Sequence, residues 1–152
     1  MLYARSGADN DFHWAIYHHI DSTSGWKYHI TGSTFHWHPA HEVIHRPLVD
    51  HRLICLVKLK EVGMDDVSVA AVKECILAED DLINERPEMT CRIYMKMACD
   101  RLKDKGILTF PGWTELQGDA WEFGNKLNPF VVFGEPLEAP RQFVFESRVV
   151  QQ

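Results

Sequence analysis

The sequence predicts an α+β fold in which a single antiparallel sheet packs against two or three helices. Two observations support this prediction. Runs rich in aromatic and β-branched residues, such as 12–17 and 26–30, favour strands. Apolar residues then recur at helical spacing in 66–80 and 90–105. Strand patterns return near the C-terminus, so strands, helices and strands follow one another around one sheet.

Composition limits the classes of protein to consider. The chain has 152 residues, 45% of them hydrophobic, which suits one domain over residues 1–152. The net charge of −6 and the lack of a Lys/Arg cluster argue against a nucleic-acid partner. No apolar run reaches the roughly 18 residues of a membrane span, and no signal peptide is evident. We therefore expect a cytoplasmic protein, and its oligomeric state stays open.

The N-terminal half should place two histidines in neighbouring strands. A short strand at 2–4 is expected first. A hairpin then joins 12–17 to 26–30 through a turn at 21–25, so that His13 and His29 lie on paired strands. Their relative face depends on the register, which the sequence does not fix. The His- and Pro-containing stretch 33–50 resembles an irregular loop, and 51–62 is expected to be a central strand.

The second half alternates helices and strands. A helix is predicted over 66–80, and another begins at Thr90, a favoured capping residue, and ends near Gly106. A third helix is expected over 113–127, ended by Asn128 and Pro129. Two strands should follow, at 130–133 and 142–150.

Cys91 is the candidate nucleophile because it lies in the first turn of the second predicted helix. Unpaired N–H groups and the positive end of the helix dipole favour a thiolate there and can hold an oxyanion. An imidazole from His13 or His29 would activate the thiol further. The four cysteines show no CxxC spacing and should be thiols in a reducing compartment. The plainer alternative makes Cys91 a small buried residue and His13 a half-buried strand residue.

Three segments carry a family resemblance: HWAIY at 13–17, YHITG at 28–32, and TCRIYMKMACDRLKDKGIL at 90–108. Together they resemble the circularly permuted papain-like superfamily, the NlpC-related group that includes lecithin:retinol acyltransferase-like enzymes. The resemblance implies an NlpC-like core with His13 as base, His29 as orienting residue and Cys91 as nucleophile. The chain also resembles small fungal proteins associated with natural-product gene clusters. Those often read Asn-Cys-Gln, where this chain has Thr90-Cys91-Arg92.

The expected function is that of a small Cys-His enzyme that acts on an apolar acyl or carbonyl compound by thiol-dependent acyl transfer or hydrolysis. An alternative uses the same pocket for a non-covalent cyclisation or isomerisation of fungal secondary metabolism, including a pericyclic reaction of Diels-Alderase type. A non-enzymatic ligand-binding module is a further alternative. No cofactor is expected. The expected substrate-contacting residues are Trp14, Tyr28, Tyr94 and Met95.

A competing motif lies at 41–45. His41-Glu42-Val43-Ile44-His45 matches HExxH, in which two histidines one helical turn apart bind zinc and the glutamate activates water. The spacing suits a helix, but Pro39 and Pro47 leave room for little more than one turn. A third ligand would come from His36, His38 or His51. A solvated His-rich loop is the favoured alternative, so zinc hydrolysis is a secondary hypothesis.

Overall fold

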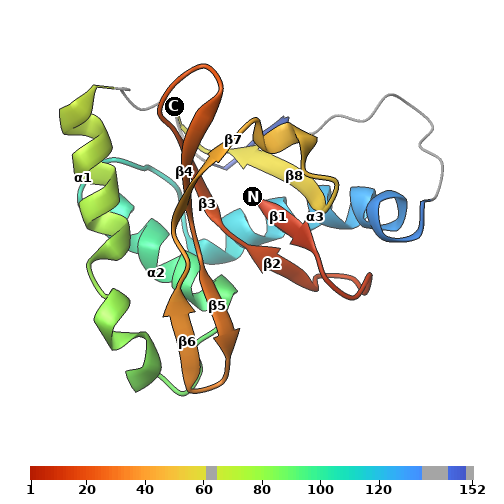
Figure 1. The fold of residues 1–152 in the computed structure, drawn as a ribbon, viewed down its shortest axis with the longest axis horizontal. Coiled ribbons are helices and arrows are strands. Elements are labelled where there is room, and N and C mark those ends of the chain that lie inside the picture. Colours follow the sequence, from red (N-terminus) through yellow and green to blue (C-terminus); the bar gives the residue numbers. More distant parts are fainter. Residues whose placement is uncertain (61–64, 135–143, 150–152) are drawn as a thin grey trace.

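The computed structural model describes residues 1–60, 65–134 and 144–149, which form an α+β arrangement (Figure 1). The described strands form three small sheets. The first sheet has the order β2-β1-β8-β9, in which β8 and β9 are parallel and the other pairs are antiparallel. Its strands are β1 (Leu2–Ala4), β2 (Phe12–Trp14), β8 (Leu53–Lys58) and β9 (Val144–Glu146).

The other two sheets are antiparallel. The second has the order β3-β4-β7, and the third pairs β5 with β6. Their strands are β3 (Ile16–His19), β4 (Ser24–Tyr28), β5 (Ile30–Ser33), β6 (His36–Pro39) and β7 (Glu42–His45). Helical elements complete the chain: η1 (Pro47–Val49), α1 (Asp66–Leu77), η2 (Asp80–Glu85), α2 (Cys91–Asp104) and α3 (Trp113–Phe133).

Several sequence-based predictions are confirmed. The short strand at 2–4 is β1, and the strand predicted over 51–62 contains β8, which lies between β1 and β9. Both predicted helices form as α1 and α2. Thr90 is the N-cap of α2, where its hydroxyl accepts a hydrogen bond from the backbone N–H of Ile93 at 3.1 Å. Residues 61–62 of the predicted strand lie outside the described part of the chain.

The prediction of one antiparallel sheet is wrong, because the strands divide among three sheets and β8–β9 is parallel. The irregular loop predicted over 33–50 is also wrong, since it holds β6, β7 and the end of β5. Most side chains of these strands are exposed, so no apolar alternation marks them in the sequence. Backbone pairing with β4 and within the β5–β6 hairpin holds them instead.

The third helix is longer than predicted. Pro129 lies inside α3, which continues to Phe133 and ends at Gly134 with a φ of 68°. The strand predicted at 130–133 is therefore wrong, because these residues form the last turn of α3. A proline inside a helix costs about 3 kcal/mol, and the adjacent buried Leu127 and Asn128 supply compensating packing. Of the strand predicted at 142–150, β9 forms, while 142, 143 and 150 lie outside the described residues.

The core lies between the helices and the strands. In β2 the side chains of Phe12 and Trp14 are buried in the main apolar cluster, together with Tyr28 and Ile30 from the second and third sheets. Figure 1 shows α1 beside β4 and α3 behind β1 and β8. Because side chains alternate along a strand, His13 projects from β2 on the side opposite to Phe12 and Trp14. That opposite side carries the candidate site.

Candidate active site

The fold brings His13 and His29 together. The Nε2 atom of His13 lies 2.9 Å from Nδ1 of His29, and the two rings meet edge to face with centroids 5.0 Å apart. His13 comes from β2, and His29 lies in the break between β4 and β5. Tyr28 and Ile30, on either side of His29, are fully buried in the core, so the imidazole of His29 points out of it. Both histidines therefore lie on one side. The prediction that they lie on paired strands is wrong, because β2 pairs with β1 and His29 lies between β4 and β5.

Burial keeps both imidazoles neutral. Desolvation, the neighbouring ring of His29 and the cation of Arg5 lower the pKa of His13 to about 4. Desolvation and the ammonium of Lys27 lower the pKa of His29 to about 4, against the opposing carboxylate of Glu42. At neutral pH the pair therefore offers uncharged nitrogens, which can accept or donate hydrogen bonds.

The surrounding charges favour one tautomer of the pair. The Nε2 atom of His29 lies 4.0 Å from a carboxylate oxygen of Glu42, which also pairs with Lys27. This carboxylate favours a proton on Nε2 of His29, so that Nδ1 accepts the hydrogen bond from Nε2–H of His13. In this tautomer Nδ1 of His13 carries no proton, and its lone pair can accept a hydrogen bond. The arrangement orients His13 as an acceptor or a base.

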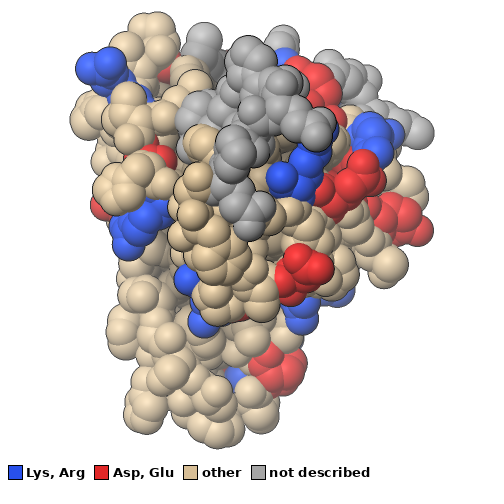
Figure 2. Space-filling view, turned by 90° about the vertical axis from the view of Figure 1, so that its right-hand side faces the viewer, with Lys and Arg blue, Asp and Glu red and all other residues tan. Residues whose placement is uncertain are grey.

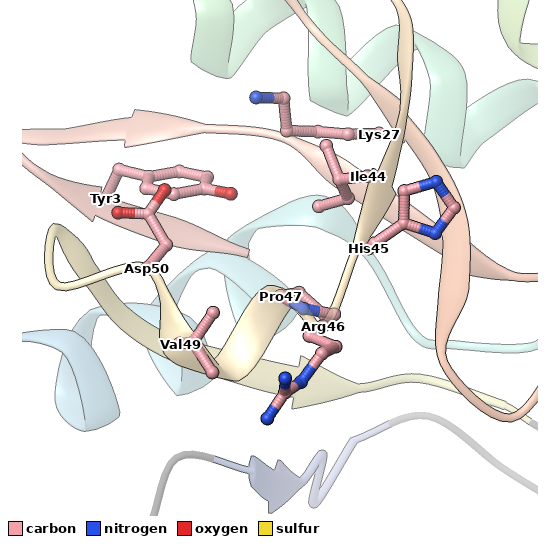
Figure 3. Close-up of a pocket in the computed structure, with 8 residues that line it drawn as sticks. All are labelled: Tyr3, Lys27, Ile44, His45, Arg46, Pro47, Val49 and Asp50. Atoms are coloured by element: carbon pink, nitrogen blue, oxygen red, sulfur yellow. The ribbon is translucent and has the colours of Figure 1, made fainter.

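A cavity of about 240 Å³ lies between the first and second sheets and is bordered by η1 (Figure 3). Neither His13 nor His29 is among its lining residues. Its volume suits a ligand smaller than a typical drug, whose pockets span about 300–1,000 Å³. Tyr3 and Asp50 form one wall in Figure 3, and Ile44 faces them. The lining residues are Tyr3, Lys27, Ile44, His45, Arg46, Pro47, Val49 and Asp50.

Tyr3 and Lys27 connect the cavity to the histidine pair. Tyr3 is the cross-strand partner of His13, and their ring centroids lie 6.3 Å apart. The ammonium of Lys27 lies 5.5 Å from the centre of the Tyr3 ring. Burial, with the carboxylates of Asp50 and Glu42, raises the pKa of Tyr3 to about 12, so its hydroxyl stays protonated at neutral pH. In the structure this hydroxyl donates to Sδ of Met1 at 3.6 Å. Tyr3 and Lys27 therefore border the cavity and also contact or approach the histidine pair.

Cys91 occupies the first position of α2, as the sequence predicted, but its sulfur faces the core. The side chain is buried, and Sγ lies 3.9 Å from the carbonyl oxygen of Phe12, the residue before His13. Within the described chain the sulfur has no hydrogen bond to either imidazole. The structure thus brings Cys91 to the backbone of β2 without pairing it with the ring of His13. Its role as nucleophile stays a prediction.

The four residues expected to contact substrate are all in the core, with 6% exposure for Trp14, 0% for Tyr28, 1% for Tyr94 and 2% for Met95. Trp14 and Met95 border a second, apolar cavity of about 50 Å³. Their burial shows that these four side chains pack in the core. A role in binding substrate stays a prediction.

The HExxH segment is not helical. Glu42 to His45 form β7, so His41 and His45 lie about 13 Å apart along an extended chain, at roughly 3.3 Å per residue. That separation is too large for both to bind one zinc ion. Nor do the described residues contain any group of three or more His, Cys, Asp or Glu side chains placed to hold a metal. His41 has other partners, namely the backbone N–H of His29 and the carboxylate of Asp80.

Sequence reasoning missed Tyr3 and Asp50. Tyr3 reaches the site only because β1 pairs with β2, and no local pattern reveals that pairing. Lys27 was detectable, because it precedes His29 by two residues and so shares its face in an extended chain. Asp50 lies in the segment that looked irregular.

The surface charges and the helix lengths concern the predictions about partners. Lys/Arg and Asp/Glu residues are interspersed on the face shown in Figure 2. In the part of the chain that the structure describes, no helix is long and apolar enough to cross a bilayer. The absence of a nucleic-acid partner stays a prediction.

Comparison with known proteins gives one match. A family model described as a family of unknown function, DUF6540, covers residues 1–109, from β1 to just beyond α2. The matched region includes His13, His29 and Cys91. No curated protein and no solved structure matches the chain.

Proposed function

The chain belongs to the DUF6540 family, and we propose that it is an enzyme whose His13–His29 pair acts on an apolar carbonyl compound without a covalent intermediate. The observation that carries the proposal is the 2.9 Å contact between the two imidazoles, next to a cavity bordered by Tyr3 and Lys27. The reaction class is a cyclisation or isomerisation of a small molecule, including a pericyclic one.

Each polar group has a role in this proposal. The hydroxyl of Tyr3 and the ammonium of Lys27 donate hydrogen bonds to the carbonyl oxygen of the substrate, where negative charge grows during enolisation or cyclisation. The Nδ1 atom of His13 accepts a proton or a hydrogen bond from the adjacent carbon or hydroxyl group. His29 holds His13 in this orientation. The apolar side chains of Ile44 and Val49 contact the body of the ligand.

The burial of Cys91 favours a non-covalent reaction over a thiolate mechanism, because its side chain is only 4% exposed. The sulfur of Cys91 also has the Phe12 carbonyl as its neighbour rather than an imidazole. Neutral histidines, in contrast, suit orientation and hydrogen bonding of a carbonyl substrate.

A thiol-dependent acyl transfer or hydrolysis is the second candidate. Two observations favour it: Cys91 opens α2, where helix N–H groups are free, and its sulfur lies beside the backbone of the residue that precedes His13. The chain order His13, His29, Cys91 is also the order that a permuted papain-like fold implies. In this version a rotation of the Cys91 side chain would have to bring Sγ to His13.

One experiment distinguishes the two candidates. A panel of apolar enones and 1,3-dicarbonyl compounds is incubated with the protein in D₂O, and product formation and deuterium uptake are followed by NMR and mass spectrometry. For a compound that the wild type converts, His13→Gln should lower the rate by about 10²–10⁴-fold, the usual contribution of a general acid–base group. Cys91→Ala should retain most of the rate.

The exposed His19→Gln serves as the matched control, because His19 lies on β3 outside the pair. Loss of activity in Cys91→Ala, together with an acyl adduct on Cys91, would replace the proposal by the covalent candidate. If the wild type converts no compound faster than the His13→Gln/His29→Gln double variant does, the enzymatic proposal fails. Saturable binding of a panel compound would then favour the ligand-binding alternative.

A further inference from the structure

We propose that His41 is a positioning residue that fixes His29, and through it the His13–His29 pair; this inference rests on the proposed function. His41 is the first histidine of the HExxH string, and the proposed reaction gives it no other role. Its side chain lies between the backbone of His29 and the helical layer of the protein.

The hydrogen bonds of His41 define its tautomer. The backbone N–H of His29 donates to Nδ1 of His41 at 3.1 Å, and Nε2 of His41 lies 2.9 Å from Oδ2 of Asp80. A backbone amide can only donate, so Nδ1 of His41 carries no proton. The proton is therefore on Nε2 and is donated to Asp80. His41 acts as a neutral bridge with a fixed direction.

The far end of this bridge is rigid. The hydroxyl of Tyr94 donates to Oδ1 of Asp80 at 2.6 Å, and the Tyr94 side chain is almost completely buried in α2. Burial and the hydrogen bond to Asp80 raise the pKa of Tyr94, which keeps this donor protonated. Both oxygens of Asp80 thus have partners, and Asp80 links α2 to His41.

The other ring nitrogen of His41, Nδ1, holds the backbone of His29. This residue lies between β4 and β5, outside the ladder of either strand. Its N–H donates to the side chain of His41, and its carbonyl oxygen accepts from the N–H of Ala40 at 2.9 Å. Both backbone groups of His29 are therefore held by residues 40 and 41. Without the acceptor on His41, the N–H of His29 loses its hydrogen-bond partner, and the imidazole of His29 is no longer fixed in its orientation.

A matched pair of substitutions separates positioning from mere packing. In His41→Asn the amide oxygen takes the place of Nδ1 and can still accept from His29. In His41→Gln the amide reaches the place of Nε2 and can contact Asp80 only. The two variants are similar in size and polarity, so a difference between them reports the contact with His29. Tyr94→Phe is the control, since it changes the far end and leaves the bond to His29 in place.

The primary readout is the titration of His13 and His29, followed by NMR of their imidazole signals in each folded variant. His41→Asn and Tyr94→Phe should keep both apparent pKa values depressed, whereas His41→Gln should shift them by at least one unit toward 6.5. With an active substrate, His41→Gln should lower kcat by at least tenfold with little change in KM.

If His41→Gln leaves the titration of both histidines as in the wild type, His41 is not a positioning residue, whatever the activity. An inactive wild type with the expected difference between His41→Asn and His41→Gln would remove the proposed function and keep the structural inference. Should His41→Gln fail to fold while His41→Asn folds, the backbone order at residue 29, measured by amide hydrogen exchange in His41→Asn and in His41→Ser, gives the same test. Equal protection in both would overturn the inference.

Discussion

The sulfur of Cys91 lies 3.9 Å from the carbonyl oxygen of Phe12, in a buried position at the start of α2. The imidazole of His13, the next residue along β2, is directed to the opposite side of the strand, where it meets His29. The thiol of Cys91 thus lies beside the backbone of Phe12, whereas the imidazole pair lies on the other side of β2. This separation is the structural reason to expect that the reaction does not need Cys91.

Cys91→Ala should leave the fold and the reaction intact. The substitution removes a buried sulfur from a packed site, and the expected loss is about 1 kcal/mol in the free energy of unfolding. Urea titration measures this loss. Cys99→Ala is the matched control, because Cys99 is equally buried in the same helix. Iodoacetamide at pH 6 should label Cys91 no faster than the buried Cys75. Cys99 is unsuitable as the labelling reference because burial raises the pKa of its thiol to about 12. Labelling of Cys91 ahead of Cys75 would indicate an activated thiol.

Stability should fall as the pH is lowered from 7 to 5. The pKa values of His13 and His29 are lowered to about 4 in the folded state, against about 6.5 in the unfolded chain. The unfolded chain therefore binds more protons in this interval, and protonation favours unfolding. The stability from the neutral pair is complete above pH 6.5 and is lost as the pH falls toward 4.

The expected loss between pH 7 and pH 5 is on the order of 4 kcal/mol for the two imidazoles together. Urea denaturation at several pH values measures it. The His13→Gln/His29→Gln variant should show a shallower dependence over this range. A double variant with an unchanged slope would show that the two imidazoles are not buried as neutral groups.

Tyr3→Phe should lower the rate and spare the fold. The substitution removes the hydroxyl that we propose as a donor to the substrate carbonyl, while the ring keeps its contacts with His13 and Lys27. Loss of one such donor typically lowers kcat by about 10²–10³-fold. Tyr17→Phe is the control, because the buried hydroxyl of Tyr17 has no hydrogen-bond partner among the described residues and lies outside the cavity. Equal rates in the two variants would remove Tyr3 from the proposed site.

Local patterns predicted the helices well because their signals are local. Asp65 and Thr90 cap α1 and α2 through their own side chains, and apolar residues recur every three to four positions. The predicted hairpin of 12–17 with 26–30 forms only in part, because β3 pairs with β4 whereas β2, which carries His13, pairs with β1. The contact of His13 with His29 was therefore not predictable from a hairpin, since the chain changes sheet between β2 and β3 and a register cannot be read from propensity.

The remaining differences have physical reasons of their own. β6 and β7 expose most of their side chains, so their strand character comes from backbone pairing that leaves no hydrophobic pattern. Pro129 is tolerated inside α3 because tertiary packing outweighs local propensity. Tyr3 belongs to the candidate site only through the pairing of β1 with β2, a strand pairing that no motif encodes.

Two glycines of α3 test how closely the helix packs against the strand that carries His13. A Cβ atom on Gly124 would lie 2.8 Å from Cδ1 of Leu2 and from ring atoms of Phe12, and both side chains are almost fully buried. A Cβ on Gly118 would meet no atom within 4 Å. Gly124→Ala should therefore lower the free energy of unfolding by about 1–3 kcal/mol through overpacking.

Gly118→Ala should instead raise the free energy of unfolding by about 0.5–1 kcal/mol. Gly118 is exposed inside α3, and alanine has a higher helix propensity than glycine at such a position. Thermal and urea unfolding of the two variants measure both effects in one helix. Since β2 carries Phe12 and His13 side by side, Gly124→Ala should also shift the NMR signals of the His13 ring. A Gly124→Ala variant as stable as Gly118→Ala would contradict the close contact between α3 and β2.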